Sequence, residues 1–305
     1  MKYLKYILIL AVVPFSYGQQ EKLFSQYMFN PSTFNAGYTG SRQVNSVFMQ
    51  HRSQWLNFEG APTTTFFNYQ TYNDNKNTGL GISFLSDQLG PLKSTEVSID
   101  YTYHLKVSNN GTLSLGLKFS GDRLNVDFND LNLYQDDSAL NVNIDRKFSP
   151  NIGAGAYYYT DKFFVGASVP RFLERRHYES SNLNEAKDKM HLYLMSGYVF
   201  DISSELKLKP MLFYRTVYGI NDQIDAAAHF LFKEKFQLGA TYRFTNAYSI
   251  MSAFQVSPNI TIGYSYDRET TELSAFNRGS HEIFLRYDFA SLKSGKLKIQ
   301  SPRFF

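Results

Sequence analysis

Apolar and polar residues alternate along most of the chain. In the segment 97–106 every second residue is apolar: Val97, Ile99, Tyr101, Tyr103 and Leu105. The same alternation recurs in the segments 112–120, 236–245 and 260–267. Successive side chains on a strand point to opposite faces, so this pattern predicts strands with one apolar and one polar face.

Alternation and turn signals together predict about fourteen strands. They are expected to begin near Asn45, Thr63, Thr78, Ser94, Thr112, Ser149, Lys162, Lys189, Glu205, Asp222, Lys235, Tyr248, Asn259 and Ser280. Strands of about ten residues cross a bilayer when they are tilted, and only a closed barrel leaves no unpaired edge in lipid. The expected fold is all-β: a closed transmembrane antiparallel β-barrel of about 14 strands, with N- and C-termini in the periplasm.

The lengths of the connections support this fold. If the first strand starts in the periplasm, every second connection should be a short turn on the periplasmic side. The three longest connections, 126–148, 172–188 and 270–279, then all fall on the outer side. Short periplasmic turns and longer outer loops are typical of outer-membrane barrels.

The cost of charge in lipid decides which face points outward. If the polar rows faced lipid, Lys118, Arg243 and Asp267 would lie in hydrocarbon, and each Lys or Arg near the midplane costs about 2–4 kcal/mol. The apolar rows are therefore expected to face lipid. The alternative is a soluble β-sandwich or barrel, in which the apolar rows form the core. Pro170 and Pro210 interrupt strand patterns and are expected near strand ends or at bulges.

The first residues have the features of an export signal. Lys2 and Lys5 precede the short apolar run 6–15, and the small residues of 16–18 suit a signal peptidase, which makes Gln19 the expected first mature residue. The chain has no cysteine, so disulfides do not stabilise it after export. Basic residues are scattered and the net charge is +4, which argues against a nucleic-acid partner.

No catalytic pattern emerges from the residues. A hydrolase would need an outward Ser/His/acid cluster, and His281-Glu282 lacks the second histidine of a zinc motif. An acidic loop could hold calcium but lacks EF-hand spacing; its residues are Asp127, Asn129, Asp130, Asp136 and Asp137. We expect no enzyme activity, catalytic residue, cofactor or metal site.

Several short runs resemble one known family. They include QYMFN at 26–30, YTGS at 38–41, WLNFEGAP at 55–62, NIGAGAYYYTDKFFVGASVP at 151–170 and GSHEIFLRY at 279–287. In this order they resemble the PorP/SprF family of outer-membrane proteins of the type IX secretion and gliding machinery. The family usually reads Asn-Pro-Ala-Tyr-Ala-Gly where residues 35–40 read NAGYTG. The resemblance therefore does not say which contact that turn makes in this chain.

The resemblance implies a non-enzymatic subunit that works in the lipid bilayer with a secreted partner. That partner would be a surface adhesin, held by its C-terminal sorting domain for export or anchoring. Family members are also associated with periplasmic ring and lipoprotein components of the machine. The alternative is a passive outer-membrane channel or porin, because the inward faces are polar. Inward aromatic residues argue for a filled interior instead: Phe66, Tyr193, Phe213 and Phe284.

Four regions follow: a signal peptide (1–18), a periplasmic or plug-like segment (19–44), the barrel (45–290) and a periplasmic tail (291–305). Residues 24–41 suit a lumen plug or a docking strap, or else a tail that closes the barrel floor. The expected contacts with the periplasmic half of the wall and with a partner come from Gln26, Tyr27, Asn30, Asn35 and Tyr38. The first outer hairpin is a partner site or an interfacial anchor plus turn, formed by Trp55, Phe58, Gly60 and Pro62.

Overall fold

The computed structural model describes residues 24–127, 144–145, 148–173, 175–176, 187–217, 220–244 and 246–289. The predicted signal peptide, the predicted periplasmic tail and most of the acidic loop therefore lie outside the described residues. The strands of the barrel wall are β1 (Ser46–Ser53), β2 (Thr63–Asn73), β3 (Thr78–Leu89), β4 (Leu92–Lys106), β5 (Thr112–Val126), β7 (Ser149–Tyr159), β8 (Phe163–Val169), β11 (His191–Tyr198), β13 (Leu206–Val217), β14 (Ile220–Phe232), β15 (Phe236–Arg243), β16 (Ala247–Ser257), β17 (Ile260–Glu269) and β18 (Ser280–Asp288).

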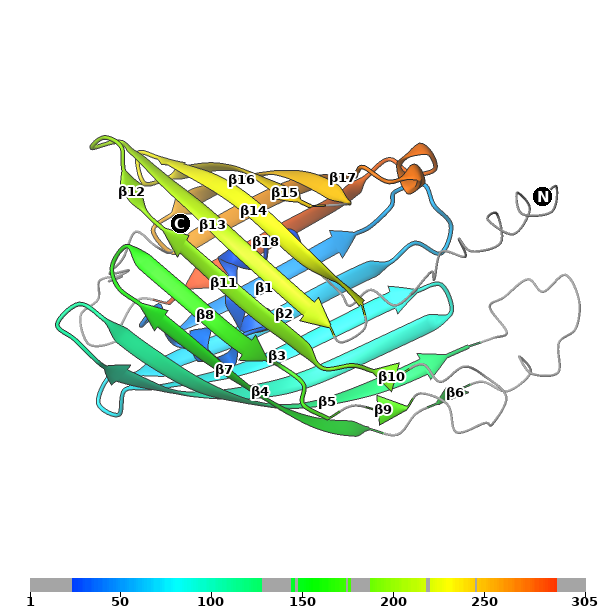
Figure 1. Ribbon diagram of the computed structural model, residues 1–305, viewed down its shortest axis with the longest axis horizontal. Coiled ribbons are helices and arrows are strands. Elements are labelled where there is room, and N and C mark those ends of the chain that lie inside the picture. Colours follow the sequence, from blue (N-terminus) through cyan, green and yellow to red (C-terminus); the bar gives the residue numbers. More distant parts are fainter. Residues whose placement is uncertain are drawn as a thin grey trace, which may run out of the picture.

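These 14 strands form a closed antiparallel barrel (Figure 1). The seam between first and last strand runs from Ser46 opposite Asp288 to Ser53 opposite His281. The wall is continuous on the far side, where β11 pairs with both β8 and β13. The predicted fold class is confirmed, and every predicted strand start lies within two residues of the observed one. The shorter elements are β6 (Ile144–Asp145), β9 (Arg175–Arg176), β10 (Lys187–Asp188), β12 (Phe200–Asp201), η1 (Tyr27–Phe29), η2 (Pro31–Thr33), η3 (Ala36–Tyr38) and η6 (Glu272–Ala275).

The two rims of the barrel differ. One rim, here called the loop rim and on the right in Figure 1, carries the connections 54–62, 127–148, 170–190 and 270–279. The opposite rim, the turn rim, carries short connections such as 74–77, 160–162 and 233–235. This confirms the predicted asymmetry of the connections. β1 starts at the turn rim and ends at the loop rim.

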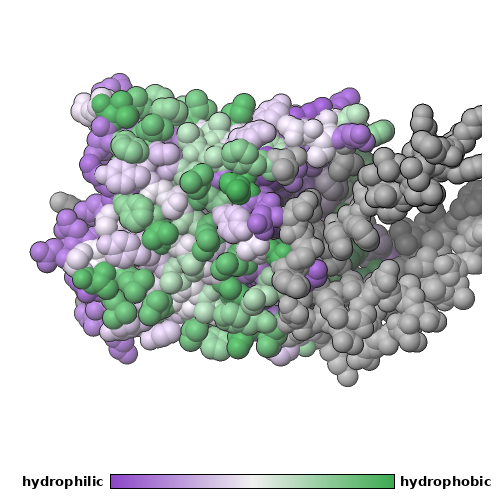
Figure 2. Space-filling model, in the orientation of Figure 1, coloured by the Kyte–Doolittle hydropathy of each residue, from purple (hydrophilic) through white to green (hydrophobic). Residues whose placement is uncertain are grey.

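The two faces of the wall differ as the alternation predicted. On β4 the outward Ile99 is 50% exposed, whereas its inward neighbour Asp100 is 1% exposed. Figure 2 shows apolar side chains gathered over the outer wall between the more polar ends. Among the described residues, no helix has the length and hydropathy needed to cross a bilayer. The outward apolar surface therefore suits contact with lipid.

Pro170 lies at a strand end as predicted, whereas Pro210 lies neither at a strand end nor at a bulge. Pro170 directly follows β8. Pro210 lies within β13, opposite the break between the partners β11 and β12, since Met211 pairs with Gly197 and Leu208 pairs with Phe200. The absent N–H therefore falls where the neighbouring ladder is interrupted.

Candidate functional site

The lumen is occupied by the chain's own residues 24–44, here called the lumen segment. This segment, dark blue in Figure 1, contains η1, η2 and η3 and is buried along almost its whole length. It runs from the loop rim towards the turn rim. Ser25 contacts Glu282 near the start of β18, Asn30 contacts Asn68 in the middle of β2, and Arg42 contacts Asp288 at the end of β18. The segment thus passes through the barrel.

Glu282 holds the first turn of the lumen segment. Its carboxylate accepts hydrogen bonds from the backbone N–H groups of Ser25 at 3.0 Å and Gln26 at 2.9 Å. The Gln26 amide donates to the backbone carbonyl of Glu282 at 3.1 Å, and the Gln50 amide donates to the Glu282 carboxylate at 2.5 Å. These four hydrogen bonds to Glu282 are here called the clasp. Charge-assisted bonds to a carboxylate are stronger than neutral ones, so the clasp fixes the position of the lumen segment.

An ion network compensates the charge of the clasp. The Arg52 guanidinium lies 3.1 Å from the Glu282 carboxylate and 2.5 Å from that of Asp267. Arg52 is directly opposite Glu282 across the β1–β18 seam. Ser25 joins the network because its hydroxyl donates to Asp267 and accepts from Arg52. A buried charge is tolerated only when it is paired and hydrogen-bonded, and all three charges meet that condition.

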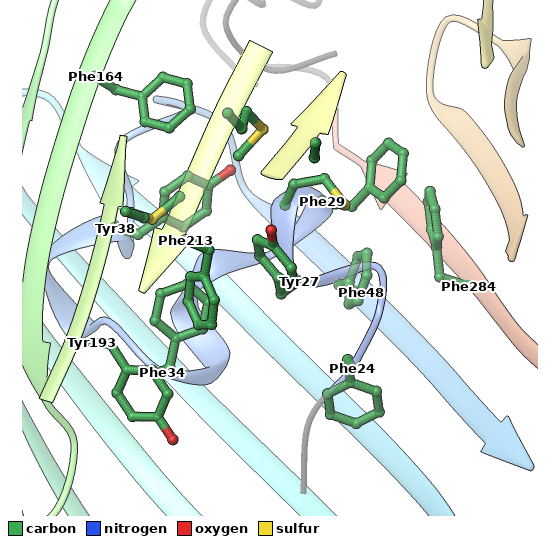
Figure 3. Packing of buried hydrophobic residues seen from close by; sticks show 14 of the residues in the cluster. Phe24, Tyr27, Phe29, Phe34, Tyr38, Phe48, Phe164, Tyr193, Phe213 and Phe284 are labelled. Carbon is green, nitrogen blue, oxygen red and sulfur yellow. The ribbon is translucent and has the colours of Figure 1, made fainter. Parts of the chain in front are cut away.

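Aromatic side chains of the segment pack against aromatic side chains of the wall (Figure 3). Tyr27 stacks on Phe213 with ring centroids 4.4 Å apart, and Phe34 meets the same ring edge-on at 5.0 Å. Phe29 packs on Phe284 at 4.6 Å.

The predicted inward aromatics Phe66, Tyr193, Phe213 and Phe284 are all buried in this cluster. The interior is therefore packed at this level.

Glycines on the inner wall leave room for the backbone of the segment. A Cβ atom on Gly116 would lie 2.4 Å from the carbonyl carbon of Ala36, and one on Gly155 would lie 2.1 Å from the Asn35 side-chain oxygen. The Asn35 oxygen also accepts from the Gly37 backbone N–H at 2.9 Å and caps η3. In the stretch that departs from the family pattern, Gly37 packs closely on the β7 backbone at Gly155. Close approach of two backbones requires such glycines.

This packing predicts the effect of a single added methyl group. Gly116→Ala is expected to lower the free energy of unfolding by about 1–3 kcal/mol, since the added methyl group would overlap the Ala36 backbone and displace this part of the lumen segment. Urea unfolding in detergent would measure the change. The matched control is Ala167→Val, which adds two methyl groups on the exposed outer face of β8 and should leave stability unchanged. Equal effects of both substitutions would contradict the close packing.

Polar side chains fix the segment near the turn rim. The Thr39 hydroxyl donates to Asp100 at 3.1 Å, and Asp100 forms a 2.9 Å ion pair with Lys118 on the neighbouring strand. Arg42 forms a 2.8 Å ion pair with Asp288 at the end of β18. The segment is therefore anchored at both ends of the lumen.

The β1–β2 connection (54–62) is fastened to neighbouring connections of the loop rim. The backbone N–H of Leu56 donates to the Gly279 carbonyl at 2.9 Å, and that of Arg278 donates to the Leu56 carbonyl at 3.0 Å. The Trp55 indole N–H donates to the Glu269 carboxylate. Trp55 and Asn57 have φ values of 50° and 68°, in the left-handed region that residues other than glycine rarely adopt. These hydrogen bonds hold the hairpin in this conformation.

The structure separates the predicted site residues into two groups. Inside the lumen, at most 3% exposed, lie Gln26, Tyr27, Asn30, Asn35 and Tyr38. On the loop rim lie Trp55, Phe58, Gly60 and Pro62, with Phe58 48% exposed. The lumen group does not gather on one half of the wall, because the segment runs through the whole lumen: Gln26 bonds to Glu282 near the loop rim.

The sequence reasoning missed Glu282 and Arg52. Both belong to polar rows, and their opposite charges on the first and last strands were the available signal. The register of a closed barrel is needed to bring them face to face.

Within the described residues, no group of three or more histidines and acids is placed to hold a metal ion. His281 points outward to the Tyr264 hydroxyl, whereas Glu282 points inward, so the two cannot share a ligand. His104 contacts the Ser114 hydroxyl at 2.6 Å in the buried lumen wall.

The fold and the filled lumen define an outer-membrane β-barrel protein. The crystal structure of Omp33 from Acinetobacter baumannii is similar, with a TM-score of 0.50 and 9% identity over 81% of this chain and 98% of that one. The KdgM porin has a TM-score of 0.39 and 12% identity, over 80% of this chain and 99% of that one. A porin from Rh. blastica has a TM-score of 0.36 and 10% identity, over 81% and 99% of the chains. No curated protein matches the sequence.

The family is established by sequence. The model described as type IX secretion system membrane protein PorP/SprF matches residues 16–287. The chain belongs to this family, as the resemblance of its short runs predicted.

Proposed function

We propose that this barrel is a non-enzymatic subunit of the type IX secretion or gliding machinery that holds a secreted surface protein at the outer membrane. The loop rim faces the cell exterior and receives the partner, an adhesin or its C-terminal sorting domain. The turn rim faces the periplasmic ring and lipoprotein components. A cleaved signal peptide (1–18) directs export. The observation that carries the proposal is the filled lumen. A barrel without an open pore does not conduct solutes, so its two rims remain as the surfaces that can bind partners.

The partner contact is placed on the hairpin 54–62 rather than on the lumen segment. Phe58 is exposed there, and the neighbouring connection presents Phe276 at 71% exposure. Strained backbone at Trp55 and Asn57 persists only where the surroundings enforce it, and such strain clusters at functional sites. An interfacial anchor would need no such fixed geometry. The lumen group supports the site by making the barrel rigid.

The test is capture of the partner from outer membranes solubilised in mild detergent. The tagged protein should recover one large surface protein together with components of the secretion machine, identified by mass spectrometry. Phe58→Ala should weaken capture of the surface protein by about 2 kcal/mol, roughly thirtyfold, because buried aromatic residues dominate interfaces.

The control for this variant is Phe230→Ala, which removes an exposed aromatic side chain from the outer face of β14. It should capture the partner as the unaltered protein does. Recovery of a barrel without any partner, or equal losses in both variants, would count against the proposed contact.

The passive channel is the second candidate, supported by the polar inward rows of the wall. Residues of the lumen segment cover many of those rows, including Asp100, Asn68 and Glu282. The packed aromatic cluster lies between them. The proposal therefore includes a closed lumen in the resting protein.

A further inference from the structure

The lumen segment passes through the barrel from the loop rim to the turn rim. This direction determines at which rim the amino end leaves the barrel. At its first residues, Ser25 is bonded to Glu282, two residues from the loop-rim end of β18. The same serine contacts Asp267, two residues from the loop-rim end of β17. At the other end, Asn45 accepts from the Thr71 hydroxyl at 2.6 Å and the chain enters β1 at the turn rim. The chain therefore descends from one rim to the other.

The lumen is packed on the turn-rim side of Phe24. The space below Phe24 is filled by the segment's own Tyr27, Phe29 and Phe34 and by the wall aromatics that pack on them. The six residue steps from Glu282 to Asp288 extend about 20 Å along the tilted strand, which is about 15 Å along the barrel axis. If cleavage follows Gly18, residues 19–23 span about 17 Å when fully extended. A return to the turn rim would therefore need nearly the whole length of a fully extended chain, through space that the aromatic cluster fills.

We propose that the amino end of the mature protein leaves the barrel at the loop rim and is displayed on the cell surface. The carboxyl end leaves at the opposite rim, where the backbone N–H of Phe289 donates to the Asn45 carbonyl at 2.8 Å. The two chain ends then lie on opposite sides of the outer membrane. The proposal rests on the outward orientation of the loop rim, which is part of the proposed function.

The absence of cysteine makes the test direct, because a single introduced thiol is the only one in the chain. Glu21→Cys marks the amino end. Ala275→Cys marks an exposed residue of the loop rim, and Ser204→Cys marks an exposed residue of the turn rim. Intact cells are treated with a membrane-impermeant biotin maleimide, and a second sample is treated after the outer membrane is permeabilised. Mass spectrometry of the labelled peptide confirms that position 21 is retained after export.

The expected result is that Glu21→Cys and Ala275→Cys are labelled equally in intact cells, whereas Ser204→Cys is labelled only after permeabilisation. Labelling of Glu21→Cys with the pattern of Ser204→Cys, or in neither sample, would overturn the proposal. If the two rim controls exchange their behaviour, surface display is also overturned, and the fault lies in the orientation assumed for the barrel. Neither arm requires a secretion partner, so failure of partner capture leaves the result unaffected.

Discussion

Deletion of residues 24–41 is expected to convert a closed barrel into a steady open channel. The wall strands keep their full pairing without the segment, since the seam β1–β18 involves none of its residues. The ion pairs Arg52–Asp267 and Asp100–Lys118 lie entirely on the wall and remain in a water-filled lumen. Single-channel recording in planar bilayers should show no steady conductance for the full chain and a steady conductance for the deletion variant.

Folding of the deletion variant is checked by its heat-modifiable mobility on gels. If that variant does not fold, Gly116→Ala offers the same readout in a full-length chain, because the added methyl group displaces the segment at Ala36. A steady, large conductance of the unaltered protein would contradict the filled lumen and would favour the passive channel.

Replacement of Glu282 by alanine is expected to destabilise the protein by about 3–5 kcal/mol. Removing one member of a buried ion network leaves the others uncompensated, and here Arg52 loses one of its two carboxylates. The backbone N–H groups of Ser25 and Gln26 also lose their acceptor in a buried site. Urea unfolding in detergent micelles would measure the difference in the free energy of unfolding.

The matched control is Glu205→Ala at the turn rim. Its carboxylate forms a 3.7 Å ion pair with Lys233, and both side chains are largely exposed. Exposed pairs contribute about 0–1 kcal/mol, so this variant should unfold almost like the unaltered protein. Similar losses at Glu282 and Glu205 would show that the clasp does not hold the segment.

The barrel wall could be predicted from the sequence because its signal is local. Alternation with period two gives both the strands and their faces, and residues as close as Ile99 and Asp100 already show it. Short turn signals then give the strand ends. These features require no knowledge of distant parts of the chain.

The lumen segment could be recognised only in outline because its contacts are distant. It has no periodicity, and the partner of Ser25 lies 257 residues further along the chain. Gly116 carries no local sign that the backbone of Ala36 will lie against it. Irregular backbone takes its conformation from what surrounds it, and these surroundings exist only after the barrel has closed.

The clasp also has a consequence for the order of assembly. Gln26 belongs to the first described turn, whereas its acceptor Glu282 belongs to the last strand of the wall, 256 residues later. A chain that is only partly exported has neither this acceptor nor a partner for the edge of β1. Such an intermediate exposes an unpaired strand edge, which invites association with other chains. Contacts of such sequence separation form slowly, so seating of the segment and closure of the wall are expected to be one late, cooperative step.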